Sequence, residues 1–133
     1  MEYKNYPGIF LRVKAAFIDV FIMIILSLAA SDLFSNINAD STYKILVFVL
    51  IFMLYEPLMV SINKATIGQR LLKLKVEKLN TGKRLNIVSA IIRFLIKSLL
   101  GWISLFTISS NQNNQAIHDI AVNSIVVFDE DYT

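Results

Sequence analysis

The chain has 133 residues, of which 56% are hydrophobic and only 17% are charged, with a net charge of +3 and a mean hydropathy of +0.60. It contains four glycines, two prolines and no cysteine, so it is neither a disulfide-stabilised domain nor a disordered or low-complexity chain. One small domain cannot bury so many apolar side chains. We therefore expect a single membrane domain over residues 1–133 rather than a water-soluble monomer.

Two apolar stretches are long enough to cross a membrane as helices. Residues 15–33 contain Asp19 as their only charge before residue 32, and residues 43–62 enclose Glu56. Each has the length of about 20 residues that a helix needs to cross a hydrocarbon core of about 30 Å. Because neither stretch has a polar face, we predict membrane helices over about 13–33 and 43–62.

The third apolar stretch, residues 87–108, leaves two interpretations open. As one helix it would be about 33 Å long and could span, but Arg93 and Lys97 would then lie inside the membrane, where cations are costly. Alternatively the segment splits at Gly101. Residues 87–100 would then form an amphipathic helix too short to cross, lying at the interface or in a re-entrant loop.

The charges outside these stretches predict the orientation of the chain. Residues 32–42 hold Asp32 and Asp40 and no cation, whereas residues 63–86 hold seven cations against Glu77. The positive-inside rule places the N-terminus and residues 63–86 in the cytoplasm, and we predict the inner membrane of a bacterium. We expect anionic lipid headgroups rather than nucleic acid to contact the basic segment. The residues predicted for this contact are Lys64, Arg70, Lys73, Lys75, Lys83 and Arg84.

A small cytoplasmic β-hairpin is predicted within the basic segment. Residues 72–77 alternate apolar and charged side chains, residues 80–83 have turn chemistry, and residues 84–86 are the expected partner strand. Residues 124–128 are a candidate third strand. That pairing requires a cytoplasmic C-terminus and favours an interfacial or re-entrant segment before it, although the tail, residues 109–133, lacks Lys and Arg.

Six charged residues lie within or beside the apolar stretches, and we predict that they form an intramembrane cluster. They are Arg12, Asp19, Glu56, Arg93, Lys97 and Asp119.

Pairing within this cluster can be predicted in part. Arg12 and Asp19 are about 10.5 Å apart along a helix axis, and the arginine side chain leans away from Asp19. We therefore expect Asp19 to meet Arg93 or Lys97, and Arg12 to meet Asp119 or a lipid phosphate. Two roles remain for the cluster: an ion or proton site built from its carboxylates, or a buried network that holds three helices in one arrangement.

Several separated motifs resemble the RDD family of small integral membrane proteins. Residues 11–19, LRVKAAFID, match the opening motif with its Arg and first Asp, and residues 66–76, TIGQRLLKLKV, resemble the loop pattern T-x-G-x-x-L-L-x-L-x-V. Residues 92–95 and 115–119, IRFL and QAIHD, match the last helix and the second Asp. Residues 111–114 depart from the family because relatives often carry Arg there. The resemblance implies a multi-helix membrane protein, with monovalent cation/proton antiport proposed for some members and accessory roles in membrane complexes for others.

No catalytic or ligand-binding motif stands out in the sequence. His118 is the only histidine, and neither a phosphate-binding loop nor a nucleophile motif occurs. We therefore expect no enzyme activity, no cofactor and no metal site.

The expected fold is an all-α membrane protein with two transmembrane helices, the third segment and the hairpin. We expect a non-enzymatic accessory or assembly subunit with a membrane-protein partner or a second copy. The alternative is a monovalent cation/proton antiporter that acts as an oligomer.

Overall fold

A computed structural model describes residues 6–38 and 40–130, and most of them are helical. Two long helices come first, α1 (Ile9–Asn36) and α2 (Ser41–Asn63). The short helix α3 (Ile67–Leu71) leads into strand β1 (Leu74–Lys78). Helix α4 (Ile87–Leu100), helix α5 (Ile103–Phe106), the 3₁₀ helix η1 (Thr107–Ser110), helix α6 (Ile117–Ala121) and strand β2 (Ser124–Phe128) complete the order.

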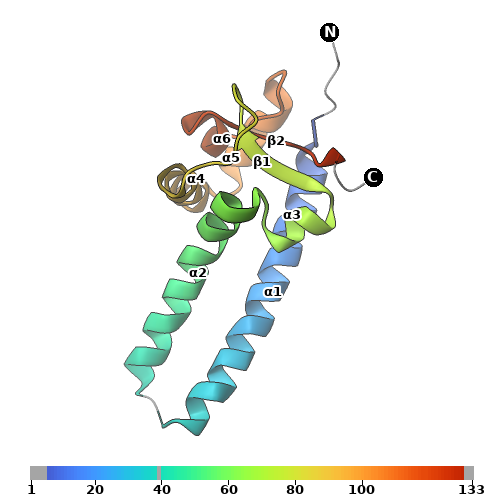
Figure 1. The fold of residues 1–133 in the computed structure, drawn as a ribbon. Helices are drawn as coiled ribbons and strands as arrows, with labels where there is room; N and C mark the ends of the chain where they lie inside the picture. Colours follow the sequence, from blue (N-terminus) through green and yellow to red (C-terminus); the bar gives the residue numbers. More distant parts are fainter. Residues whose placement is uncertain (1–5, 39, 131–133) are drawn as a thin grey trace.

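Helices α1 and α2 form an antiparallel pair that extends away from the rest of the chain (Figure 1). Among the described helices, α2 is long and apolar enough to cross a membrane, and α4 with α5 and η1 would be a second candidate if the bent pair counted as one span. Large apolar side chains on α1 and α2 are exposed along both helices, including Phe21 and Leu28 on α1 and Phe52 on α2. Such surfaces are typical of helices that contact lipid or other membrane helices.

The third apolar stretch is broken at Gly101. Helix α4 ends at Leu100, and the direction of the chain changes by 103° before the α5–η1 segment. Gly101 has φ +52° and ψ −127°, a conformation that a side chain at this position would strain. Of the two interpretations of residues 87–108, the structure therefore agrees with the split at Gly101 and not with one uninterrupted helix.

The described strands form one antiparallel sheet, in which β1 pairs with β2 and Val76 lies opposite Val126. The predicted hairpin is wrong, because residues 84–86 form no strand. On the other edge of β1, the Val76 amide donates to the Lys64 carbonyl at 2.5 Å and the Lys78 amide donates to the Lys83 carbonyl at 2.8 Å. Residues 124–128, the candidate third strand, are instead the direct partner of β1. This pairing places the C-terminal strand beside the basic segment.

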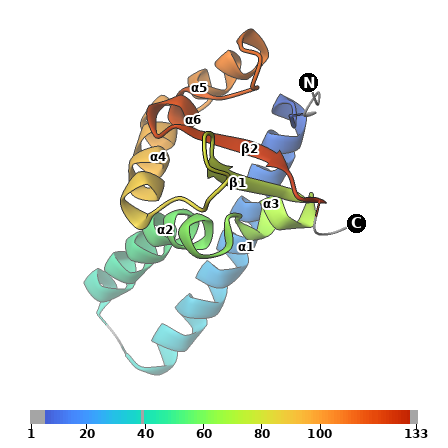
Figure 2. The ribbon, with the colours of Figure 1, turned by 45° about the horizontal axis from the view of Figure 1, so that its top comes forward.

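The sheet lies across one end of α1 and α2, with α4 along its side (Figure 2). A small apolar core joins the end of α2, both strands and the start of α4. Its buried members are Val60, Leu74, Val76, Leu85, Ala90 and Val126. This packing holds α2 and α4 in place, and with them the charged residues that these two helices carry.

Helix α4 is amphipathic, and its apolar face is the exposed one. It is viewed nearly end-on in Figure 1, where α1 and α2 lie lengthwise in the plane of the picture, so it crosses them rather than continuing them. Arg93 is only 2% exposed. The exposed large apolar side chains of α4 are Ile87, Val88, Ile91, Ile92, Leu95 and Leu99. In a water-soluble domain the opposite arrangement is usual, with the charged face outside.

Candidate functional site

Asp119 is the centre of a buried charge network. It is the third residue of α6, and its Oδ2 accepts a hydrogen bond from the Ala116 amide at 3.1 Å, which caps the start of that helix. The same oxygen accepts from Arg12 Nη1, and Oδ1 accepts from Arg93 Nε at 3.0 Å. This fully buried carboxylate therefore connects α1, α4 and α6.

Glu56 extends the network to α2. Its Oε1 accepts from Arg93 Nη1 at 2.8 Å, and its Oε2 accepts from Lys97 Nζ at 2.7 Å. Arg93 and Lys97 are four residues apart on α4, so they lie on one face of that helix. The resulting series of ion pairs joins α1, α2, α4 and α6. It includes five of the six residues predicted for the cluster, and Asp19 is the exception.

Arg12 pairs with Asp119, one of the two partners predicted for it, and its second contact is to the backbone. Its Nη2 donates to the Asn114 carbonyl at 2.6 Å. Asn114 has φ +48°, a conformation that asparagine tolerates better than most residues. Arg12 is 9% exposed, and its Nε is buried without a hydrogen-bond partner among the described residues. One N–H donor of Arg12 therefore makes no hydrogen bond to the described residues.

His118 lies beside the network as a neutral side chain. Its Nδ1 is 2.6 Å from Ser104 Oγ, and its Nε2 is 3.6 Å from Asp119 Oδ1. Burial and the nearby positive charge of Arg93 lower the pKa of His118 from 6.5 to about 3. Burial alone would raise the pKa of Asp119, but Arg93 and Arg12 lower it well below its ordinary value, so Asp119 stays ionised.

Asp19 belongs to a second set of contacts, and the prediction that it meets Arg93 or Lys97 is wrong. Its Oδ1 accepts from the Tyr55 hydroxyl at 2.8 Å and from the Gly68 amide at 2.8 Å, and its Oδ2 accepts from the Thr66 hydroxyl at 2.6 Å. All of these hydrogen-bond partners are uncharged. Asp19 therefore fastens the start of α3 to α1.

Gly68 makes this attachment possible. A Cβ atom at residue 68 would lie 2.2 Å from the carbonyl oxygen of Ala15 and 2.9 Å from the Asp19 carboxyl group. Thr66 caps α3 by accepting from the Gln69 amide, and the Gln69 side chain accepts from the Thr66 amide. Tyr55, Thr66 and Gly68 were not predicted as site residues, although the T-x-G of the loop pattern marks two of them.

The six basic residues predicted to contact headgroups differ in their surroundings. Lys64 Nζ donates to the Gly82 carbonyl at 2.9 Å, and Lys75 Nζ is 3.1 Å from Asp129 Oδ1. The other four side chains are exposed: Arg70, Lys73, Lys83 and Arg84.

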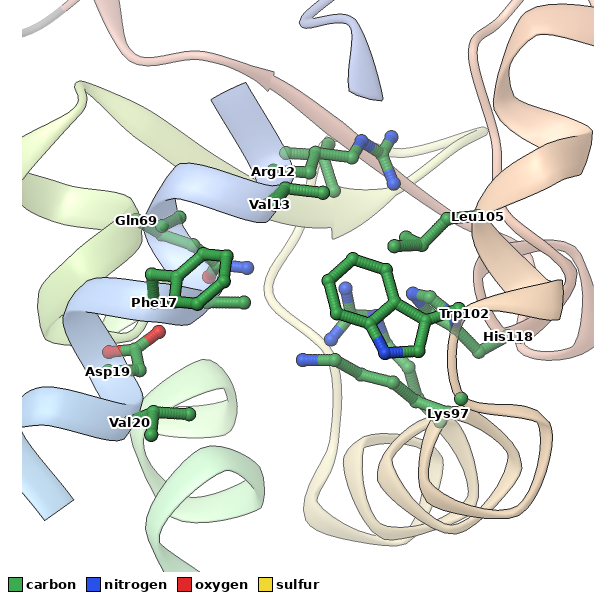
Figure 3. Close-up of a pocket in the computed structure, with 15 residues that line it drawn as sticks. Arg12, Val13, Phe17, Asp19, Val20, Gln69, Lys97, Trp102, Leu105 and His118 are labelled. Carbon is green, nitrogen blue, oxygen red and sulfur yellow. The ribbon is translucent and has the colours of Figure 1, made fainter. Parts of the chain in front are cut away.

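A cavity of about 270 Å³ lies between α1 and the α4–α5 segment (Figure 3). Phe17 and Val20 line it from α1, and Trp102 and Leu105 line it from the other side. Its charged lining residues are Arg12, Asp19, Arg93 and Lys97. The cavity thus adjoins the charge network and the Asp19 attachment at once.

A mostly helical chain with a helix apolar enough to span, exposed apolar faces and a buried arginine–aspartate network has the features of a small membrane protein. Residues 6–123 match the RDD family, and the chain belongs to that family. Comparisons with curated proteins and with solved structures gave no match. Among the described residues, no group of three or more His, Cys, Asp or Glu side chains is arranged to hold a metal ion.

Proposed function

We propose that this RDD-family protein is a non-enzymatic accessory or assembly subunit of a membrane complex. The observation that carries the proposal is that each carboxylate of the predicted cluster is held by fixed donors. Asp119 and Glu56 each pair with two cationic side chains, and Asp19 accepts three hydrogen bonds. Carboxylates held in this way position helices, whereas a transport site needs a carboxylate that can release its partners and take up an ion.

In the proposed orientation, α1 and α2 both cross the membrane, and α4 with α5 lies in the cytoplasmic interface. The excess of Lys and Arg in residues 63–86 supports this side. The exposed apolar face of α4 supports the interfacial position, since that face would enter the acyl region while Arg93 stays paired within the protein. Trp102, 65% exposed at the start of α5, is of the residue type enriched at this depth.

The proposed partner is another membrane helix, from a second copy or from a different protein. Exposed apolar side chains cover both α1 and α2, and small residues on α1 such as Ala29 and Ala30 would allow close helix approach. The ion pairs hold one end of the two helices in a defined arrangement. In this proposal they preset the surface that the partner contacts.

Monovalent cation/proton antiport is the second candidate, and Asp19 is the observation that favours it. Asp19 lines the cavity, and its hydrogen-bond partners are all uncharged. An aspartate whose charge is not balanced by a cation is the better candidate for binding an exchangeable ion.

A flux measurement separates the two candidates. The protein is reconstituted in vesicles that contain a pH-sensitive dye, and pulses of Na⁺ or K⁺ are added outside. The proposed subunit role predicts no proton flux above that of protein-free vesicles. Proton flux that is lost in Asp19→Asn and kept in Asp32→Asn, a matched change in the exposed end of α1, would replace the subunit proposal with antiport.

The assembly role also needs positive evidence, and the absence of cysteine makes a clean test possible. Single cysteines at the exposed positions Phe21 and Leu28 on α1 are oxidised in native membranes. For self-assembly we expect disulfide-linked dimers at one or both positions, and for a different partner a discrete larger adduct with a thiol crosslinker. If neither product forms, α1 has no protein partner on this face and the assembly role is wrong as stated.

A further inference from the structure

The cavity between α1 and the α4–α5 segment has the composition of a site for one phospholipid molecule. Its walls are apolar, with Phe17 and Val20 facing Trp102 and Leu105. A volume of about 270 Å³ is enough for a headgroup phosphate with its glycerol, but far too small for a folded partner. Three of these lining side chains, Phe17, Val20 and Trp102, are more than half exposed, so in a bilayer the cavity would open towards acyl chains.

The cationic members of the charge network line the cavity, whereas their partners Asp119 and Glu56 do not. Three lining side chains are cationic, Arg12, Arg93 and Lys97, and one is a carboxylate, Asp19. Both oxygens of Asp19 already accept hydrogen bonds from Tyr55, Thr66 and Gly68, so this carboxylate is occupied on the α3 side. The cavity therefore has more cationic than anionic side chains along its wall.

Lys97 is the lining cation that has donors to spare and can be reached from the cavity. Its Nζ pairs with Glu56 Oε2 at 2.7 Å, and its side chain is 32% exposed. Figure 3 shows Lys97 reaching into the cavity below Trp102. A phosphate oxygen would accept from the remaining donors of this ammonium group.

We infer that this cavity binds the phosphate of an anionic glycerophospholipid from the cytoplasmic leaflet, with Lys97 as the phosphate donor. The glycerol and the first acyl carbons would lie against Trp102 and Phe17. The inference rests on the membrane location of the chain and does not depend on its role as an assembly subunit. It differs from headgroup contact by the exposed basic segment, because it assigns one lipid to one defined cavity.

Trp102 is the only tryptophan of the chain and lines the cavity, so it reports directly on the occupant. The full-length protein is reconstituted in phosphatidylcholine vesicles with small fractions of brominated phosphatidylglycerol or, separately, brominated phosphatidylcholine. Bromine quenches tryptophan at close range, and the zwitterionic lipid gives the level expected from random neighbours. We expect saturable quenching by phosphatidylglycerol at roughly five-fold lower mole fraction, since one or more lysine or arginine side chains would hold the anionic headgroup.

Lys97→Gln should remove most of this preference, and Lys97→Arg should keep it. Lys83→Gln is the matched control, because Lys83 is exposed on the basic segment and does not line the cavity. Equal quenching of the wild type by both lipids would overturn the inference without any variant. A Lys83→Gln loss as large as that of Lys97→Gln would also overturn it, because the preference would then come from the general surface charge. Loss of the preference on adding inorganic phosphate or glycerol 3-phosphate would overturn the lipid assignment in favour of a soluble phosphate.

Discussion

Asp119→Asn is the substitution that tests the buried network most directly. Asparagine keeps the shape of the side chain but removes the charge that pairs with Arg12 and Arg93. Arg93 retains its pair with Glu56, whereas Arg12 retains the carbonyl of Asn114 as its hydrogen-bond acceptor among the described residues. The substitution therefore leaves a buried arginine without a counter-charge.

The size of the effect follows from the burial of the partners. The side chain of Asp119 is fully buried, and those of Arg12 and Arg93 are 7% and 3% exposed. Removing one partner of a buried ion pair costs about 3–5 kcal/mol of the free energy of unfolding. Lys97→Gln removes an ion pair in which the lysine side chain is 32% exposed, so its cost should be about 1 kcal/mol.

Unfolding of the purified protein by SDS in mixed micelles, followed through Trp102 fluorescence, measures both losses. The double variant Arg12→Met/Asp119→Asn should be more stable than the sum of the single losses predicts, by about 1–3 kcal/mol, because the two groups are in contact. Additivity within about 0.5 kcal/mol would show that Arg12 and Asp119 do not interact. An Asp119→Asn loss no larger than that of Lys97→Gln would refute the argument from burial.

Three further predictions concern the loop, the histidine and the orientation. Gly68→Ala should abolish the folded protein in gel filtration because of its contact with the Ala15 carbonyl, whereas Gly8→Ala, which meets nothing within 4 Å, should elute as the wild type does. Because the pKa of His118 is lowered from 6.5 to about 3 in the folded chain, the unfolded state binds the proton first, so stability should fall as the pH drops from 6.5 towards 3. His118→Gln should remove that part of the pH dependence. If the variant lost stability between pH 6.5 and 3 as the wild type does in SDS unfolding, the assignment to His118 would be wrong. A cysteine at Asn38 should react with an impermeant maleimide in intact cells and one at Thr81 only after permeabilisation, and the reverse pattern would invert the proposed topology.

The sequence predicts the partners of charged side chains better than it predicts hydrogen bonds from uncharged donors. The pair between Arg12 and Asp119 was predictable because a buried arginine needs a counter-charge, and few carboxylates lie at a suitable place. The same reasoning led to the wrong partner for Asp19, since it looked for a cation. A carboxylate is also satisfied by hydroxyl groups and backbone amides, and the amide of Gly68 has no signature beyond the glycine itself.

The strand pairing was misjudged because turn residues suggested a local partner. The Gly82 amide does bond back to the Lys78 carbonyl at 2.9 Å, so the turn forms as expected. The edge of β1 that a hairpin would use, however, donates to the carbonyls of Lys64 and Lys83. The free edge then pairs with β2, about fifty residues later in the chain. Local turn chemistry identifies where a chain reverses, but the strand that fills the neighbouring position depends on tertiary packing.

Helix α4 shows why hydropathy left two interpretations of residues 87–108. A cation at membrane depth costs much less when a counter-charge pairs with it, and the hydropathy of a segment does not contain that information. The counter-charges of Arg93 are Glu56, 37 residues away on α2, and Asp119, 26 residues away on α6. Both lie on the side of α4 opposite to its exposed apolar residues, so the helix keeps its arginine within the protein and presents its apolar face outward. A spanning helix would have to surround Arg93 and Lys97 with partners at mid-membrane depth, whereas a helix at the interface needs them on one face only.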